Sequence, residues 1–245
     1  MKPIDYYEYW NKNRIDAHRK RLLHREAISL RTLARIVQPG QTLLDAGCGN
    51  GMFLQRIAER FSELNLKGVD YSKHEVQEAR KNGFDVKQAD FGEGIPLKKT
   101  SVDIVYAGEV IEHLYNPDKL VTEAHRMLRK GGYFLLSTPN LCSWFNRILM
   151  PLGIQPLFLE PSTKSKMVGA GFLGRFKIGE QPVGHVRIFT LRALKDMLEM
   201  YGFRVVRVNG ANYDEGFPSL ALFADTFFTL FPSLSSHIVV LARKK

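Results

Sequence analysis

The chain has 245 residues, of which 44% are hydrophobic and 24% charged, and this balance is typical of one globular α/β domain with additions. The start of the chain lacks the apolar core of a signal peptide, and no stretch holds the roughly 18 uncharged apolar residues of a membrane-spanning helix, so a cytoplasmic location is expected. The net charge of +10 suits nucleic acid, anionic lipid or a phosphorylated substrate, and it fits a solvated surface equally well.

The first predicted element is a basic helix over residues 14–37, where apolar side chains recur on one side. Pro39 and Gly40 end this pattern. Residues 1–38 are therefore expected to form an N-terminal helical segment that precedes the sheet within a single domain over residues 1–245.

A glycine-rich turn follows a short apolar strand at residues 41–46 and leads into a helix at residues 51–61. Such a turn lets backbone N–H groups and the helix N-terminus face a ligand, and a side chain there would hold the ligand off the backbone. Small residues fill the turn: Gly47, Cys48, Gly49 and Gly51.

Two departures separate this turn from a dinucleotide-binding loop. Met52 holds the position where that loop has its third glycine. Asp45 ends the strand, and a carboxylate there suits a ligand with positive charge better than a pyrophosphate. The turn therefore indicates a different ligand from NAD.

Strands alternate with helices beyond the turn, which predicts a parallel, doubly wound sheet. The helix at residues 118–128 is expected to stop at the run Lys130-Gly131-Gly132. The remaining expected strands are residues 66–70, 84–88, 102–107, 133–137, 203–208 and 237–242, and the remaining expected helices are residues 73–82 and 190–201.

Two segments interrupt this alternation. Residues 140–184 are rich in glycine, proline and aromatic residues without clear periodicity, and so long a segment is typical of a functional lid or cap. Residues 217–231 are very apolar, with Asp225 in the middle. They predict either a helix packed against the sheet, or an interfacial helix or lipid pocket that would allow peripheral membrane contact.

The strand–Asp-x-Gly-x-Gly-x-Gly–helix pattern resembles motif I of the class I S-adenosylmethionine (SAM) methyltransferases. This resemblance implies a Rossmann-like, seven-stranded, mostly parallel sheet of order 3-2-1-4-5-7-6 flanked by helices, with residues 140–184 as an inserted substrate cap. Acidic residues at successive strand ends suit the sulfonium and amino groups of SAM, and ligands of such sheets bind at that edge. The residues expected to bind SAM are Asp45, Gly47, Cys48, Gly49, Gly51, Asp70, Tyr71, Asp90, Phe91 and Glu109.

Within that set, Asp70 is expected to accept hydrogen bonds from the ribose hydroxyls, as an acidic residue does in dinucleotide folds. Tyr71 is expected to pack on the adenine. The resemblance places Asp90 near the adenine amino group.

A second cluster follows the strand at residues 102–107. Glu109, Glu112 and His113 are spaced so that one helical turn would place them on one face. Together with His185 they could hold a divalent cation, Mg²⁺ or Mn²⁺. His185 could equally act without metal as a general base or substrate contact, or be structural.

The Glu-x-x-Glu-His pattern with a later histidine resembles two methyltransferase groups. These are the catechol O-methyltransferases of ubiquinone biosynthesis and the small-RNA 3′-terminal 2′-O-methyltransferases, and the resemblance implies a cation that helps ionise the hydroxyl. Many class I enzymes not known to need a metal have the same pattern.

The predicted function is SAM-dependent methylation of a hydroxyl, less favourably an amine, on a small-molecule or lipid-linked acceptor. His113 and His185 are the candidate catalytic residues. The alternatives are an RNA 2′-O-methyltransferase, which the basic charge favours, and a SAM-binding protein without catalysis.

Overall fold

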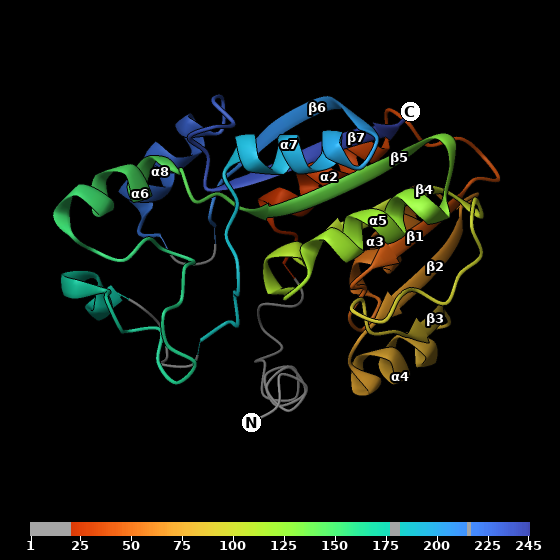
Figure 1. Cartoon of the computed structure of the whole chain (residues 1–245), viewed down its shortest axis with the longest axis horizontal. Coiled ribbons are helices and arrows are strands. Elements are labelled where there is room, and N and C mark those ends of the chain that lie inside the picture. Colours follow the sequence, from red (N-terminus) through yellow and green to blue (C-terminus); the bar gives the residue numbers. More distant parts are fainter. Residues whose placement is uncertain (1–20, 177–181, 215–216) are drawn as a thin grey trace.

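The computed structural model describes residues 21–176, 182–214 and 217–245. The strands are β1 (Thr42–Ala46), β2 (Asn65–Asp70), β3 (Asp85–Gln88), β4 (Val102–Gly108), β5 (Leu128–Pro139), β6 (Phe203–Ala211) and β7 (His237–Lys244). They form one sheet in the order β3-β2-β1-β4-β5-β7-β6, and β7 is antiparallel to both of its neighbours (Figure 1). This arrangement confirms the predicted fold class and strand order.

Helices cover both faces of this sheet. The α-helices are α2 (His24–Leu33), α3 (Met52–Arg60), α4 (Lys73–Lys81), α5 (Pro117–Met127), α6 (Trp144–Leu149), α7 (Leu191–Met200) and α8 (Ser219–Phe228), and the 3₁₀ helices are η2 (Ile111–His113), η3 (Met150–Leu152) and η4 (Gly171–Phe176). Within the described ranges, each helix is too short or too polar to cross a membrane.

The buried strands divide the core into two layers, because successive side chains of a strand point to opposite faces. Leu43 packs in the layer that includes α2 and α3, and its neighbour Leu44 packs in the layer that includes α5 and α7. Leu135 and Phe134 of β5 divide in the same way. The continuous apolar runs of these strands therefore reflect burial on both faces.

Local signals explain where several helices begin. The Ser72 hydroxyl accepts a hydrogen bond from the backbone N–H of Glu75 at the start of α4, and Thr190 caps α7 through the N–H of Ala193. The Asn116 side chain caps α5, and Pro117 occupies its first turn.

Two expected boundaries differ in the structure. The helix expected over residues 14–37 is observed only as His24–Leu33, and residues 1–20 lie outside the described part of the chain. Lys130-Gly131-Gly132 does not end a helix, because α5 stops at Met127 and these residues belong to β5. The pairing of β4 with β5 shifts register there, so the glycines accommodate an irregularity in the strand.

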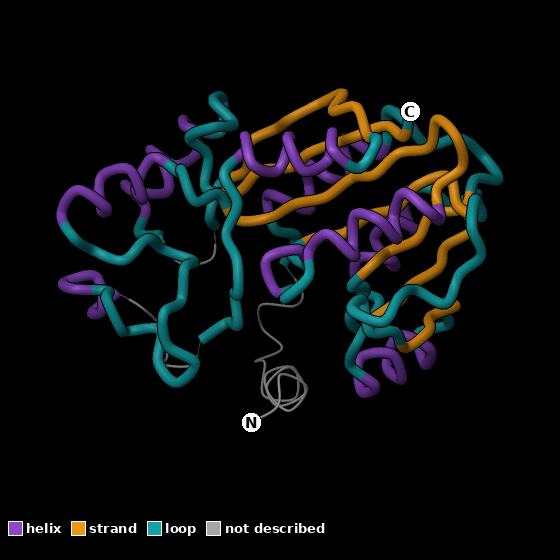
Figure 2. The backbone as a smooth tube through the Cα atoms, in the orientation of Figure 1, coloured by secondary structure: helices purple, strands orange, loops and turns teal. Residues whose placement is uncertain are grey.

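Two segments of the chain after β5 form a lobe at the end of the sheet, with α6 and α8 next to one another (Figure 1). We call the described residues 141–176 and 212–236 the cap. Much of the segment after β5 is loop (Figure 2). Asn140 at the end of β5 joins the two parts of the cap, because its side-chain amide donates to the carbonyls of Ser233 and Ser235 at 3.2 and 2.8 Å.

Candidate cofactor and acceptor site

The glycine turn is a tight backbone loop at the carboxyl end of β1. Gly47 has a φ of +92°, and a Cβ added there would lie 2.3 Å from Cγ2 of Val110. Gly49 has a φ of +52°, and its N–H donates to Oδ2 of Asp70 at 2.8 Å. Both positions require glycine, because L side chains rarely adopt such φ values. The turn is thereby tied to the end of β2.

Two buried carboxylates lie beside the turn. Asp45 is almost fully buried at the end of β1, and burial, then the nearby Asp70 charge, raises its pKa well above the usual value. Burial likewise raises the pKa of Asp70 to about 6, although its carboxylate accepts hydrogen bonds from the N–H groups of Ser72 and Gly49. A cationic ligand would relieve the repulsion between the two groups, so this site fits SAM.

The other residues expected to bind SAM differ in the placement of their side chains. The side chains of Cys48 and Phe91 are buried in the hydrophobic core, so a contact from Cys48 would come from its backbone. Tyr71 and Asp90 follow the ends of β2 and β3 at the same edge of the sheet, with Tyr71 half-buried and Asp90 exposed. Gly51 is the N-cap of α3 in a left-handed conformation.

Glu109 follows β4 with a φ of +56°, an unusual value for a residue with a side chain. Its carboxylate accepts a hydrogen bond from the Ser137 hydroxyl at 2.8 Å and lies 3.5 Å from Nε of Arg25 and 3.4 Å from Nε2 of His237. Burial alone would raise the pKa of Glu109, but the charges of Arg25 and His237 hold it well below the usual value. Glu109 is therefore an ionised bridge between α2, β4 and β7.

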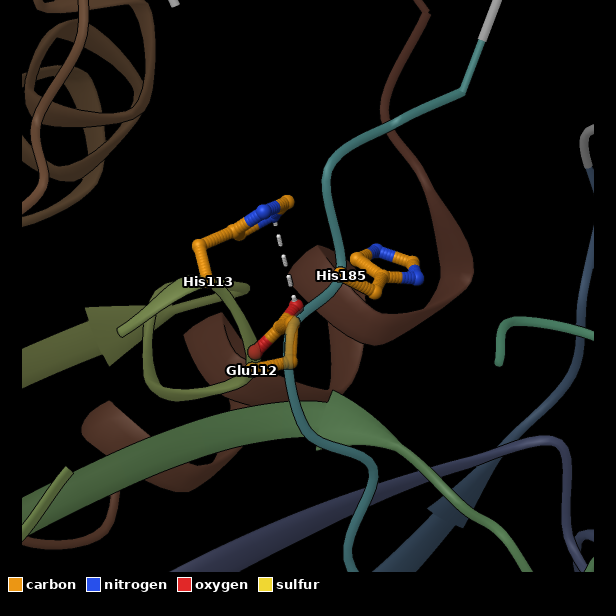
Figure 3. A group of neighbouring side chains, drawn as sticks. All are labelled: Glu112, His113 and His185. Carbon is orange, nitrogen blue, oxygen red and sulfur yellow. Dashed lines mark ion pairs between the residues drawn. The ribbon is translucent and has the colours of Figure 1, made fainter. Parts of the chain in front are cut away.

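Glu112, His113 and His185 form a compact group of neighbouring side chains (Figure 3). Each offers one ligand atom, and these atoms lie within 4.8 Å of one another. The chain after His185 docks here, because the N–H groups of Val186 and Arg187 donate to the Glu112 carbonyl at 2.8 and 3.0 Å. The structure thus brings His185 to Glu112 as predicted, while it engages Glu109 elsewhere.

The hydrogen bonds of the two histidines define their tautomers. Nδ1 of His113 lies 3.1 Å from the carbonyl of Gly184, and Nδ1 of His185 lies 2.8 Å from the carbonyl of Phe158. Because a carbonyl only accepts, each Nδ1 carries a proton, and Nε2 is the atom that carries the lone pair when the ring is neutral. Nε2 of His113 lies 3.9 Å from Oε1 of Glu112 (Figure 3). Burial lowers the pKa of His185, which keeps its ring neutral.

Glu112 supplies the carboxylate of this group from the core. Its Oε2 accepts a hydrogen bond from the Thr138 hydroxyl at 3.0 Å, whereas the buried Oε1 has no hydrogen-bond partner among the described residues. Burial, and then the Glu109 charge, raises the pKa of Glu112 well above its usual value. A bound cation would satisfy Oε1, so carboxylate and imidazole donors together fit a divalent metal ion.

Comparison with known proteins agrees with this geometry. Residues 15–208 match a family model described as a methyltransferase domain. The chain belongs to this methyltransferase family. A SAM-dependent methyltransferase from Archaeoglobus fulgidus has the same fold, with a TM-score of 0.57 at 19% identity over 98% of this chain and 99% of that chain.

Curated methyltransferases resemble this member of the family over a shorter region. A "Probable S-adenosylmethionine-dependent methyltransferase" of Mycolicibacterium smegmatis is 40% identical over 103 residues, covering 41% of this chain and 39% of that protein. The mitochondrial ubiquinone biosynthesis O-methyltransferase of Candida albicans is 32% identical over 127 residues, covering 44% of this chain and 36% of that protein. The chain thus matches less than half the length of each relative.

Several residues of this methyltransferase site were not expected from the sequence. In the sequence Arg25 is one of many basic residues of the first predicted helix, and His237 is the start of a predicted strand, yet both contact Glu109. Glu160 and Phe158 lie in the cap segment without periodicity, and both contact the residues around His185. The available signal is the position of Glu109, an acidic residue just after the apolar strand at residues 102–107, because a carboxylate next to the core demands a cationic partner.

Proposed function

We propose that this protein transfers the methyl group of SAM to a hydroxyl oxygen of a small-molecule or lipid-linked acceptor. The observation that carries the proposal is the neutral imidazole of His185, placed beside Glu112 and His113 at the sheet edge that also carries the glycine turn. The match to a ubiquinone biosynthesis O-methyltransferase supports oxygen as the atom methylated.

SAM would supply a methyl group activated by its sulfonium. The residues of this chain would hold it: the backbone of the glycine turn, Asp45 beside the positive groups, Asp70 at the ribose, and Asp90 and Tyr71 near the adenine. Most of the catalysis would then come from positioning, because correct alignment of two reactants is worth as much as about 7–11 kcal/mol.

The acceptor hydroxyl must lose its proton during methyl transfer. Nε2 of His185 has the lone pair needed to accept that proton, since Nδ1 is held by the Phe158 carbonyl. His113 is fixed in the same tautomer by the Gly184 carbonyl. These two residues are therefore the proposed catalytic histidines.

The alternative form of the proposal has Mg²⁺ or Mn²⁺ bound by Glu112, His113 and His185, with the Nε2 lone pairs of the two histidines coordinating the ion instead of accepting the proton. When bound, such an ion polarises a hydroxyl and lowers its pKa. Glu109 is left out of this set because its carboxylate faces Arg25 and His237. Glu109 instead keeps the polar end of β4 in place next to the cofactor site.

The test is methyl transfer from radiolabelled SAM to a panel of catechols, phenols and isoprenoid-linked phenols, with formation of S-adenosylhomocysteine measured in parallel. We expect a methyl ether product and a loss of about 10²–10⁴-fold with His185→Gln. Labelling of RNA alone would establish the RNA methyltransferase instead. Tight SAM binding with no product from any acceptor would favour the binding protein.

A further inference from the structure

Helix α8 exposes its apolar face and buries its charge. Leu220, Phe223, Phe227 and Leu230 are 83%, 76%, 54% and 70% exposed, whereas Asp225 is fully buried. The first three lie on α8 at helical spacing, so they form one continuous face, and Leu230 lies in the turn that follows the helix. Soluble helices normally have the opposite arrangement.

Hydrogen bonds of the buried side hold this orientation. The Asp225 carboxylate accepts hydrogen bonds from Nε1 of Trp144, from the Ser236 hydroxyl and from the N–H of Tyr213. The Trp144 ring also stacks on Phe228, with 5.3 Å between the ring centroids. Rotating α8 to bury its phenylalanines would leave this carboxylate and its donors unsatisfied, which is costly.

A second exposed apolar set lies on the neighbouring part of the cap. Ile148 at the end of α6 is 56% exposed, and Met150 and Leu152 of η3 are 55% and 64% exposed. Helices α6 and α8 are adjacent at this end of the molecule (Figure 1). Clustered exposed apolar residues of this kind mark an interaction surface.

The exposed charges of the described cap residues have one sign. Among the described cap residues 141–174 and 217–236, Arg147 and Lys164 are the exposed charged residues, and both are basic. The Glu160 carboxylate is half-buried and accepts backbone N–H groups, and Asp225 is buried. An apolar face on a cap whose exposed charges are basic is complementary to a bilayer that contains anionic lipids.

We propose that α8 and the α6–η3 segment dock this protein onto an anionic lipid surface. A helix of ten residues is about 15 Å long, which suits insertion in the plane of the headgroups. Docking would place the cap against the membrane. The proposal concerns binding alone and is independent of methyl transfer.

The experiment is co-sedimentation of the full chain with vesicles of phosphatidylcholine, with and without phosphatidylglycerol, in the absence of SAM. We expect binding to the anionic vesicles that weakens as salt is added. Phe223→Ser combined with Phe227→Ser should lower the partition coefficient by about tenfold or more. Leu220→Ser with Leu230→Ser should have the same effect, while Met200→Ser, an exposed apolar position on α7, should have none.

Charge is tested with variants of equal net charge. Arg147→Glu with Lys164→Glu should weaken binding to the anionic vesicles, whereas Lys98→Glu with Lys99→Glu, in the exposed loop before β4, should not. Failure of the wild type to bind anionic vesicles would overturn the proposal. Equal losses in the two charge variants would also overturn it. A dimer that Phe223→Ser with Phe227→Ser converts to a monomer would assign the face to a second copy.

Discussion

The carboxylate of Glu160 accepts the backbone N–H of His185 at 3.2 Å, together with the N–H groups of Gly184 and Val183 at 2.7 Å each. Glu160 thus holds the segment that supplies one catalytic candidate and the carbonyl that orients the other. Removal of this carboxylate should release both histidines. Glu160 is therefore a positioning residue for the proposed reaction.

For Glu160→Gln we expect faster amide exchange at residues 183–185, because an amide has one acceptor atom where the carboxylate has two. Turnover should fall by about tenfold or more while SAM affinity is unchanged, since the glycine turn is not involved. Glu63→Gln, at an exposed position, is the control. Hydrogen–deuterium exchange measures the amide exchange rates at residues 183–185 directly. Unchanged rates there would contradict the positioning role of Glu160.

Gly47→Ala should destabilise the protein more than Gly83→Ala. Both residues have a positive φ, which costs about 1–2 kcal/mol for alanine. Gly83 has open space around it, whereas a Cβ at Gly47 meets the Val110 side chain and should cost about 1–3 kcal/mol more. Urea unfolding gives the two free energies. Equal losses of unfolding free energy in the two variants would mean that the Val110 side chain moves away from the added Cβ at no cost in free energy.

SAM affinity should depend on pH through Asp70. Its pKa of about 6 leaves it protonated at pH 5 and ionised at pH 7. Only the ionised form attracts the cationic ligand and accepts from the ribose hydroxyls, so affinity should increase about tenfold between these pH values. Calorimetric titration at each pH measures this change. In Asp70→Asn the increase in SAM affinity between pH 5 and pH 7 should shrink to the part due to Asp45. An unchanged increase would exclude Asp70 as the cause of the pH dependence.

Glu112 and Glu109 should differ in their effect on metal binding. We expect Glu112→Gln to weaken Mn²⁺ binding by at least about tenfold, because it removes the charged donor of the group. Glu109→Gln should leave most of the Mn²⁺ affinity but lower the unfolding free energy, since Arg25 and His237 lose their anionic partner. Electron paramagnetic resonance of Mn²⁺ separates the two outcomes, with His125→Gln as a control. An equal loss of affinity in both variants would place Glu109 among the ligands.

The sheet could be predicted because its signals are local. The apolar runs of the strands, the caps Ser72 and Thr190, and the glycine turn each act over a few residues. The prediction that a helix ends at Lys130-Gly131-Gly132 was wrong, because a glycine pair fits an irregularity in a strand as well as the end of a helix.

The candidate site could be predicted only in part. The cluster from Glu109 to His113 is contiguous, and SAM-type motifs mark the strand ends. The ion pair between Arg25 and Glu109 and the contact of Glu160 with His185 join distant parts of the chain. The first depends on how α2 packs against the sheet and the second on how the cap folds back toward it, and no local pattern encodes either geometry.

The hydrogen bonds of Asn140 make the two separate parts of the cap structurally interdependent. A chimaera that exchanged only the segment after β5 for that of another methyltransferase would place a foreign surface against the native loop that precedes β7. Exchanging the whole cap by recombination would thus need both segments to be replaced at once. The cofactor half of the sheet could remain untouched.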